Sequence, residues 1–194
     1  MQRPRVRTAT SAEEAQIVDT VVAAFAADPV ARWCWPNAHE YLHNMPAFTL
    51  AFGGTGIAHD GAHCTDGYSG AALWLPPGVH SDQEALGQLV EDSGAASTRG
   101  ELYAVLEHMA SYHPSEPHWY LPLIGVDPAH QGKGHGTALL TYALERCDRD
   151  RCLAYLESTN PKNIPLYQRH GFKALGEIQV GSSPPLVPML RTPQ

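Results

Sequence analysis

Residues 126–136, VDPAHQGKGHG, limit the possible folds of this chain more than any other stretch. They follow an apolar run that is typical of a β-strand, HWYLPLIGV at 118–126, and they precede a stretch with helical spacing of its apolar residues, 137–147. The three alternating glycines let successive backbone N–H groups point into one concavity at the positive end of the helix dipole. A strand, such a loop and a helix in this order indicate a site for a phosphate group.

Two common phosphate-binding motifs do not fit this loop. A Walker loop needs G-x-x-x-x-G-K-[ST], but Gly134 follows Gly132-Lys133, and Asp127 stands where the first glycine should be. The dinucleotide fingerprint G-x-G-x-x-G fails because Gly136 comes one residue early. A plain turn that links the strand to the helix is an alternative, although such a turn needs one or two glycines rather than three. We therefore expect the loop to hold a pyrophosphate.

The composition indicates one globular domain. The chain has 194 residues, of which 43% are hydrophobic and 17% are charged. This length and composition are sufficient for one hydrophobic core. A net charge of −7 argues against a nucleic-acid-binding surface. Neither the first 14 residues nor any later segment has an apolar run of signal-peptide or transmembrane length, so we expect a cytoplasmic protein with no membrane partner. The cysteines form no C-x-x-C pair, which indicates reduced thiols: Cys34, Cys64, Cys147 and Cys152.

The charges are unevenly distributed along the chain. No lysine or arginine occurs between Arg32 and Arg99, an interval that contains many acidic residues. Basic residues gather instead between Lys133 and Lys173. This pattern favours a basic half for an anionic cofactor and an acidic half that attracts a cationic molecule. An acidic, solvated surface without a binding role is an equally simple interpretation.

Strand-like and helical patterns alternate along the chain. Strands are expected at 5–9, 55–59, 70–75, 118–126, 152–158, 172–178 and 186–191, and helices at 12–27, 39–52, 81–91, 99–109, from about 137, and at 163–171. Ser11 and Glu14 have the spacing of a capping box, and Asp28-Pro29 should end the first helix. The alternation predicts an α/β or α+β fold around one mixed sheet.

Two motifs resemble one known family. Residues 131–136, QGKGHG, match the Q/R-x-x-G-x-G/A signature of the GNAT superfamily of N-acetyltransferases, whose loop binds the pyrophosphate of acetyl-CoA. The stretch LESTNPKNIPLYQRHGF, 156–172, resembles the later strand–helix motif of that family. Combined with PHWYLPLIGVDPAHQGKGHG, it resembles the puromycin N-acetyltransferase branch in particular. The resemblance covers 117–172 well and is weaker upstream, in AFAADPVARW and AALWLPPGV.

The resemblance implies a fold and a reaction. The fold is a single domain, 1–194, with a mixed, mostly antiparallel sheet that is splayed between two strands and flanked by helices. Residues 1–116 would mainly form the acceptor side and 117–194 the acetyl-CoA-binding core. The implied reaction is the direct transfer of an acetyl group, through a tetrahedral intermediate, to the primary amine of a small, cationic molecule. Binding of an acyl-CoA without turnover, as a regulatory module, is the alternative.

The resemblance also assigns residues to acetyl-CoA. The implied contacts come from the end of the strand, the loop and one later asparagine: Leu123, Ile124, Gly125, Val126, Gln131, Gly132, Lys133, Gly134, His135, Gly136, Thr137 and Asn160. The strand residues would bind pantetheine through their backbone while their side chains lie in the core. Gly125 would relax the strand into a bulge, with a backbone N–H near Val126 pointing at the acetyl oxygen. Asn160 is also a typical turn residue before proline.

Two residues are candidates for the chemistry. By the resemblance, Tyr167 would act as general acid toward the coenzyme A sulfur, although a tyrosine there also suits helix packing. The strand 118–126 lacks the carboxylate that many family members have. Glu157, near the end of the neighbouring strand, is the best candidate for a base or an amine-binding group. Asp28 and His118 are less favoured.

One further motif indicates a different chemistry. HEYLH, 39–43, satisfies the H-E-x-x-H pattern of zinc metalloproteases. No third ligand follows at the extended spacing of that class, and Pro46 should disturb a long metal-binding helix. We therefore expect no metal. Aromatic residues nearby suit either an acceptor pocket or the core: Trp33, Trp35 and Tyr41.

Overall fold

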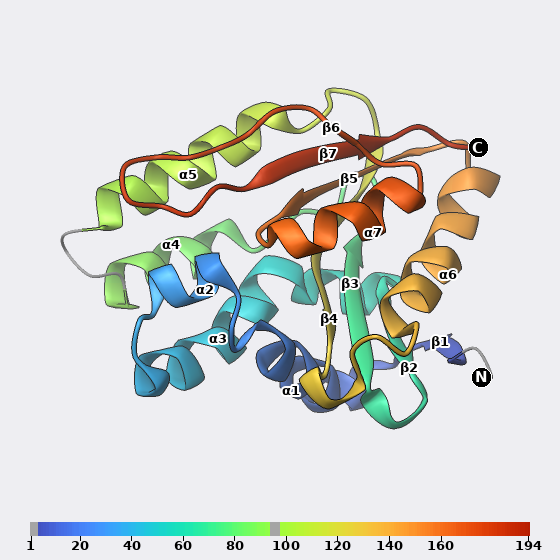
Figure 1. Ribbon diagram of the computed structural model, residues 1–194, viewed down its shortest axis with the longest axis horizontal. Coiled ribbons are helices and arrows are strands. Elements are labelled where there is room, and N and C mark those ends of the chain that lie inside the picture. The colour runs from blue at the N-terminus through green and yellow to red at the C-terminus, as the bar shows by residue number, and fades with distance from the viewer. Residues whose placement is uncertain (1–3, 94–97) are drawn as a thin grey trace.

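The computed structural model describes residues 4–93 and 98–194, so the first three residues of the N-terminal stretch discussed above lie outside it. The described residues form one open sheet of seven strands (Figure 1). Its strands are β1 (Val6–Thr8), β2 (Ala62–Thr65), β3 (Gly70–Leu75), β4 (His118–Val126), β5 (Leu153–Ser158), β6 (Lys173–Ala174) and β7 (Val187–Arg191). Their order is β1-β2-β3-β4-β5-β7-β6; the β4–β5 pair is parallel and the other pairs are antiparallel. The expected mixed, mostly antiparallel sheet is confirmed.

Helices cover both faces of the sheet. They are α1 (Glu14–Phe25), α2 (Pro29–Cys34), α3 (Ala38–Gly53), α4 (Gln83–Ser93), α5 (Arg99–Tyr112), α6 (His135–Arg149) and α7 (Ile164–Arg169). Strand β3 shows the two faces clearly, because Leu73 packs with α1 and α3 while Trp74 packs with α6 and α7. All six residues of β3 are buried, as expected for a strand with helices on both sides.

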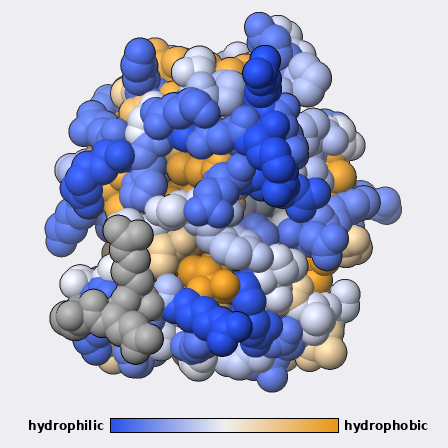
Figure 2. All heavy atoms as spheres, turned by 90° about the vertical axis from the view of Figure 1, so that its right-hand side faces the viewer, coloured by the Kyte–Doolittle hydropathy of each residue, from blue (hydrophilic) through white to orange (hydrophobic). Residues whose placement is uncertain are grey.

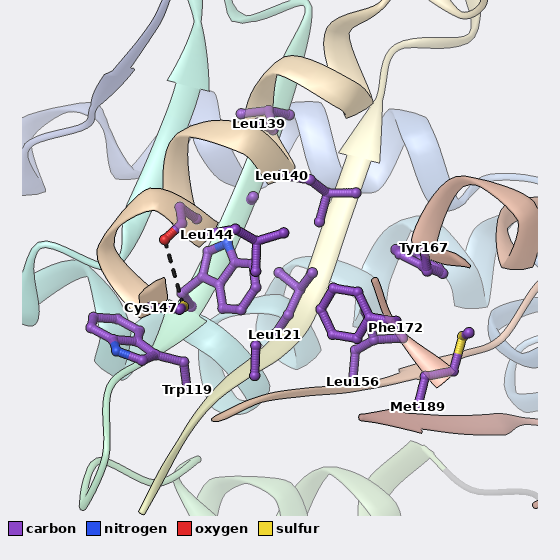
Figure 3. Close-up of a cluster of buried hydrophobic side chains, with 14 residues drawn as sticks. Trp119, Leu121, Leu139, Leu140, Leu144, Cys147, Leu156, Tyr167, Phe172 and Met189 are labelled. Carbon is purple, nitrogen blue, oxygen red and sulfur yellow. Dashed lines mark hydrogen bonds between the residues drawn. The ribbon is translucent and has the colours of Figure 1, made fainter. Parts of the chain in front are cut away.

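The core beneath α6 explains why this helix forms where it does. Its inner face carries Leu139, Leu140 and Leu144, which are nearly inaccessible to solvent and pack with side chains of β4, β5 and α7 (Figure 3). Burying each leucine contributes about 1.5–3 kcal/mol. Figure 2, which faces the α6 side of the molecule, shows mainly hydrophilic residues on the outer surface. This amphipathic helix holds the glycine loop at its N-terminus against the sheet.

Strand β4 contains a bulge that the sequence interpretation placed wrongly. The register between β3 and β4 shifts between Leu73 and Leu75, opposite residues 121–122 and not at Gly125. Pro122 has no backbone N–H to donate to the ladder, so this is where the pairing breaks. Gly125 has another role. A Cβ atom there would lie 2.4 Å from the Cβ of Ala24, so glycine lets α1 approach the strand closely.

Three other local expectations are corrected by the structure. Residues 55–59 belong to the 3-10 helix η2 (Gly54–His59), which lies so close to β3 that a Cβ at Gly56 would be 2.2 Å from the carbonyl oxygen of Trp74. The capping box is formed by Thr10 and Glu13, one residue before the expected pair. Helix α3 continues through Pro46.

Within the described residues, no helix is long and apolar enough to cross a membrane. The four cysteines are unpaired, in agreement with the expectation of free thiols.

Candidate functional site

The centre of the site is the place where β4 and β5 separate. The two strands pair over three positions, with His118 opposite Leu153 and Tyr120 opposite Tyr155 at the two ends of the paired segment. Beyond these positions the strands diverge (Figure 1), and in the described part of the chain neither facing edge has a strand partner. An extended chain with amide groups can pair with such an edge as an added strand. The splayed sheet implied by the resemblance is therefore present.

The glycine loop follows β4 and leads into α6. Gly132 and Gly134 have φ values of +74° and +88°, a conformation that glycine adopts without steric cost. Gly134 is the N-cap residue of α6, and no side chain caps the helix there. The first N–H groups of α6 therefore remain available to an anion, at the positive end of the helix dipole.

The side chains of the loop mostly bind the protein itself. The Lys133 ammonium donates to the Ala129 carbonyl at 2.9 Å, and the Gln131 amide donates to the Val126 carbonyl at 3.3 Å. The His135 ring lies 3.1 Å from the Thr65 hydroxyl. Burial, followed by the nearby charges of His130 and Lys133, lowers the pKa of His135, so its ring is neutral near pH 7. Backbone N–H groups, more than side-chain charges, therefore define this anion site.

Tyr167 lies in α7 on the same side of the sheet. Its ring is buried and makes an edge-to-face contact with Phe172, with ring centroids 6.1 Å apart (Figure 3). Its hydroxyl makes no hydrogen bond to any residue that the structure describes. Burial, and secondarily the charge of Asp28, raise the pKa of Tyr167. The ring thus packs in the core, while the protonated hydroxyl is available as a donor.

Asp28 connects the N-terminal half to the end of β5. One carboxylate oxygen accepts the backbone N–H groups of Val30 and Ala31 at the start of α2, at 3.0 and 3.1 Å. The other accepts the Thr159 hydroxyl at 2.6 Å. Burial raises the pKa of Asp28, although these hydrogen bonds oppose the shift. Because both oxygens already have partners, the structure favours a positioning role for Asp28 over the role of base.

Asn160 occupies the turn after β5. Its side-chain oxygen accepts the backbone N–H of Lys162 at 3.1 Å and caps the 3-10 helix η5 (Pro161–Asn163). The turn role is therefore present. The pantetheine contact implied by the resemblance stays a prediction for the side-chain nitrogen of Asn160.

Glu157 lies on the face of β5 opposite to α7. Its side chain is only 3% exposed. The Tyr120 hydroxyl donates to Oε2 at 2.8 Å, whereas Oε1 lies 3.5 Å from Nε2 of His113 and accepts no hydrogen bond from the described residues. Burial, followed by the charge of Glu157, raises the pKa of both Tyr120 and Tyr155. These tyrosines stay protonated, and Glu157 is the carboxylate candidate for the base on this face.

His113 and Tyr120 were not singled out from the sequence. Strand alternation predicts that Tyr120 shares a face with His118, but His113 comes from the end of α5 and reaches Glu157 only through the tertiary fold.

A cavity of about 950 Å³ opens next to this cluster, between α4, α5 and the adjoining ends of β3 and β4. Tyr120, His113 and His118 line it, together with the exposed carboxylates of Glu107 and Glu116. The cavity therefore connects solvent with the residues that contact Glu157.

Comparisons with known proteins agree with this geometry. The model of the acetyltransferase (GNAT) family matches residues 72–172, which include β4, the glycine loop, β5 and α7. The chain belongs to the GNAT family. An uncharacterized N-acetyltransferase of Schizosaccharomyces pombe is 27% identical over 142 residues, which is 66% of this chain and 58% of that protein. This GNAT chain thus aligns with little more than half of that relative.

Solved structures resemble this GNAT protein over its whole length. A crystal structure described as histone acetyltransferase HPA2 and related acetyltransferase, from Corynebacterium glutamicum, has a TM-score of 0.73 and 28% identity, and covers 100% of this chain and 98% of its own. A polyamine N-acetyltransferase of Drosophila melanogaster has a TM-score of 0.65 and 15% identity, with coverage of 97% and 99%. The second likeness concerns the fold alone.

The metalloprotease motif of this GNAT protein lies apart from the site. His39, Glu40 and His43 are exposed on α3, with the two imidazole centroids 6.3 Å apart. The described residues contain no group of three or more histidine, cysteine, aspartate or glutamate side chains that could hold a metal ion.

The aromatic residues near the end of α2 mainly serve packing. Trp35 and Tyr41 are buried, and the Tyr41 hydroxyl donates to the Val22 carbonyl at 2.6 Å. Trp33 is partly buried and donates to the Ser182 hydroxyl at 3.1 Å. Trp33 and Trp35 line an apolar cavity of about 40 Å³, which is too small for an amine substrate of the expected kind.

Proposed function

We propose that this protein transfers the acetyl group of acetyl-CoA directly to the primary amine of a small, cationic molecule. The observation that carries the proposal is the divergence of β4 from β5 beside the uncapped N-terminus of α6. This arrangement places an extended backbone edge next to an anion site. The edge suits pantetheine, and the anion site suits the pyrophosphate that follows pantetheine in the cofactor.

Acetyl-CoA fits the residues that are present. The edge of β4 between the bulge and Val126 would pair with pantetheine, and one of its N–H groups would polarise the acetyl oxygen. The loop backbone from Gly132 to Thr137 would surround the pyrophosphate, because a Cβ atom at Gly132 or Gly134 meets at most one distant contact and the space is open. The chemistry that acetyl-CoA supplies is an activated thioester.

The protein's own groups then manage protons and charge. The amine nitrogen attacks the thioester carbon, and collapse of the tetrahedral intermediate breaks the C–S bond. Glu157 takes the proton that the nitrogen loses. Because the pKa of Tyr167 is raised well above the value of about 8.5 for a thiol, its hydroxyl stabilises the thiolate by a hydrogen bond, and solvent supplies the final proton. The role proposed for Tyr167 therefore differs from the expected general acid: the hydroxyl donates a hydrogen bond but keeps its proton.

The charge distribution supports a cationic acceptor. Residues 33–98 contain no lysine or arginine, and the cavity beside His113 carries Glu107 and Glu116 at its surface. The structural neighbour from Drosophila melanogaster is named for polyamines, which are cations of this kind. Ile178 and Leu186, near β7, pack against α5, so residues after 116 would also support the acceptor side.

A thiol-release screen tests the proposal. Purified protein with acetyl-CoA should release free thiol only when an amine is present, and polyamines and aminonucleosides should outperform aminoglycosides and peptide N-termini. Tight acetyl-CoA binding without amine-dependent release from any of these acceptors would contradict the proposal and indicate a regulatory acyl-CoA-binding module.

Gly134→Val should raise the KM for acetyl-CoA about tenfold or more, because a β-branched residue at φ +88° forces the loop N–H groups away from the pyrophosphate. Steady-state kinetics at a saturating amine concentration measures this. Gly78→Val is the matched control: it has a φ of +82° and open space around it, and it lines the cavity of about 950 Å³ rather than the loop, so any effect of this variant should fall on the amine and not on the KM for acetyl-CoA. An equal rise in KM for both variants would show that the effect is general strain and not the loop.

A further inference from the structure

A chain of ionisable groups leads from Glu157 to the cavity. Glu157 Oε1 lies 3.5 Å from Nε2 of His113. The other nitrogen of that ring, Nδ1, lies 3.1 Å from Nε2 of His118. Nδ1 of His118 in turn lies 2.8 Å from the carbonyl oxygen of Glu116. Both imidazole rings line the cavity of about 950 Å³.

A single carbonyl group fixes the proton positions along this chain. A carbonyl oxygen only accepts, so Nδ1 of His118 carries a proton and Nε2 of the neutral ring is an acceptor. His113 must then donate its Nδ1–H to His118. In the neutral His113 ring this leaves Nε2 without a proton, facing the carboxylate of Glu157. The geometry therefore places an empty proton acceptor directly beside the buried base.

We propose that His113 and His118 form a proton relay that carries the proton of the acceptor amine from Glu157 to solvent in the cavity. The relay rests on the proposed function. The N–H bond of the amine breaks as an O–H bond forms at Glu157, and that proton passes to Nε2 of His113. The ring then gives up its Nδ1 proton to Nε2 of His118, and the doubly protonated His118 ring releases its Nδ1 proton to cavity water that replaces the Glu116 carbonyl as its partner. Rotation of both rings, or exchange of their protons with water, restores the starting tautomers. The base Glu157 is thus regenerated after each turnover.

The groups around His113 and His118 favour proton transfer through the two rings over a permanent ion pair between His113 and Glu157. Ionisable groups face the two rings from the strands and from the loop after β3: Tyr120, Tyr155, Glu157 and His80. Burial is the main cause that lowers the pKa of His118, and the charges of His113 and His80 act in the same direction. A His118 ring that is neutral near pH 7 accepts a proton from His113 and gives it up readily.

Nitrogen-15 NMR of the histidine rings tests the proton positions without any substrate. We expect His118 to be neutral near pH 7 with its proton on Nδ1, the tautomer that is less common in water. His118→Asn identifies the signal. Finding His118 with its proton on Nε2 would overturn the relay, because Nε2 could not then accept from His113.

Rescue by a small proton carrier tests the transfer itself. His118→Asn keeps a donor for the Glu116 carbonyl, and His113→Asn keeps a donor for His118, but neither asparagine accepts a proton. We expect each variant to lose about tenfold in kcat in weak buffer, and added imidazole to restore most of it, with amine-free blanks subtracted. His108→Asn, which changes an exposed histidine of α5 outside the cavity lining, should lose little and show no rescue. A loss that imidazole does not restore, or no loss, would overturn the relay.

The two hypotheses fail in distinguishable ways. Amine-dependent thiol release by the unaltered protein tests the proposed function. The relay is tested by the ratio of kcat between each variant and the unaltered protein and by the histidine tautomers that NMR detects.

Discussion

Glu157→Gln is expected to lower kcat about 10²- to 10⁴-fold, the usual contribution of a general base. Glutamine has the same shape and still accepts the hydrogen bond that Tyr120 makes at 2.8 Å, so the fold should be retained. It cannot take the proton of the attacking amine. Steady-state kinetics with the best acceptor from the screen measures the effect, and thermal unfolding of both proteins verifies that the variant is folded.

The split between kcat and KM separates the two roles considered for Glu157. Loss of a base lowers kcat, whereas loss of an amine-binding group raises the KM for the amine with little change in kcat. Glu107→Gln, which removes an exposed carboxylate of the same cavity, is the control for general attraction of cations. Activity of Glu157→Gln within twofold of the unaltered protein excludes Glu157 as the base.

Tyr167→Phe should lower kcat about 10- to 10²-fold and leave the KM for acetyl-CoA nearly unchanged. A hydrogen bond to a charged group contributes about 1.5–3 kcal/mol, which corresponds to this factor. The Tyr167 hydroxyl has no partner among the described residues, so its removal should not lower the melting temperature, and the phenyl ring keeps its contact with Phe172. Because the pKa of Tyr167 is raised, no alkaline loss of activity from this group is expected up to about pH 10.

Tyr142→Phe is a suitable comparison for Tyr167→Phe. Tyr142 lies on α6 and its hydroxyl contacts the hydroxyl of Thr8 at 3.3 Å, on the far side of the helix from the diverging strands. Similar losses in both variants, or a clear drop in the melting temperature of Tyr167→Phe alone, would indicate that Tyr167 acts through packing.

Features with a local cause were predictable from the sequence. The bounds of β3 and β4 agree with the apolar runs 70–75 and 118–126, because a strand buried on both faces reads as a continuous apolar stretch. The loop was also predictable, because positive φ values, as at Gly132 and Gly134, favour glycine, and glycines at this spacing can be recognised in the sequence. The family resemblance supplied the splayed sheet, which no periodicity reveals.

Features that depend on distant neighbours were not predictable. Gly125 suggested a bulge, but its reason is the approach of Ala24 from another element, while the missing N–H of Pro122 marks the true position. Residues 55–59 have a strand-like composition, yet they form the 3-10 helix η2, in which Gly56 packs closely against the carbonyl group of Trp74. His113 precedes Glu157 by more than 40 positions, so its place beside that carboxylate follows only from the packing of α5.

The short parallel pairing of β4 and β5 has a consequence for how the molecule is assembled. Three paired positions join four strands on one side to three on the other, so the sheet is nearly two sheets with unprotected edges facing each other inside the protein. Such edges elsewhere invite pairing with foreign chains. Here they face a gap that, in the proposed complex, only a narrow extended ligand can fill. Acetyl-CoA would then complete the sheet as an added strand as well as serve as the substrate. It would occupy this position in each turnover until its acetyl group has been transferred.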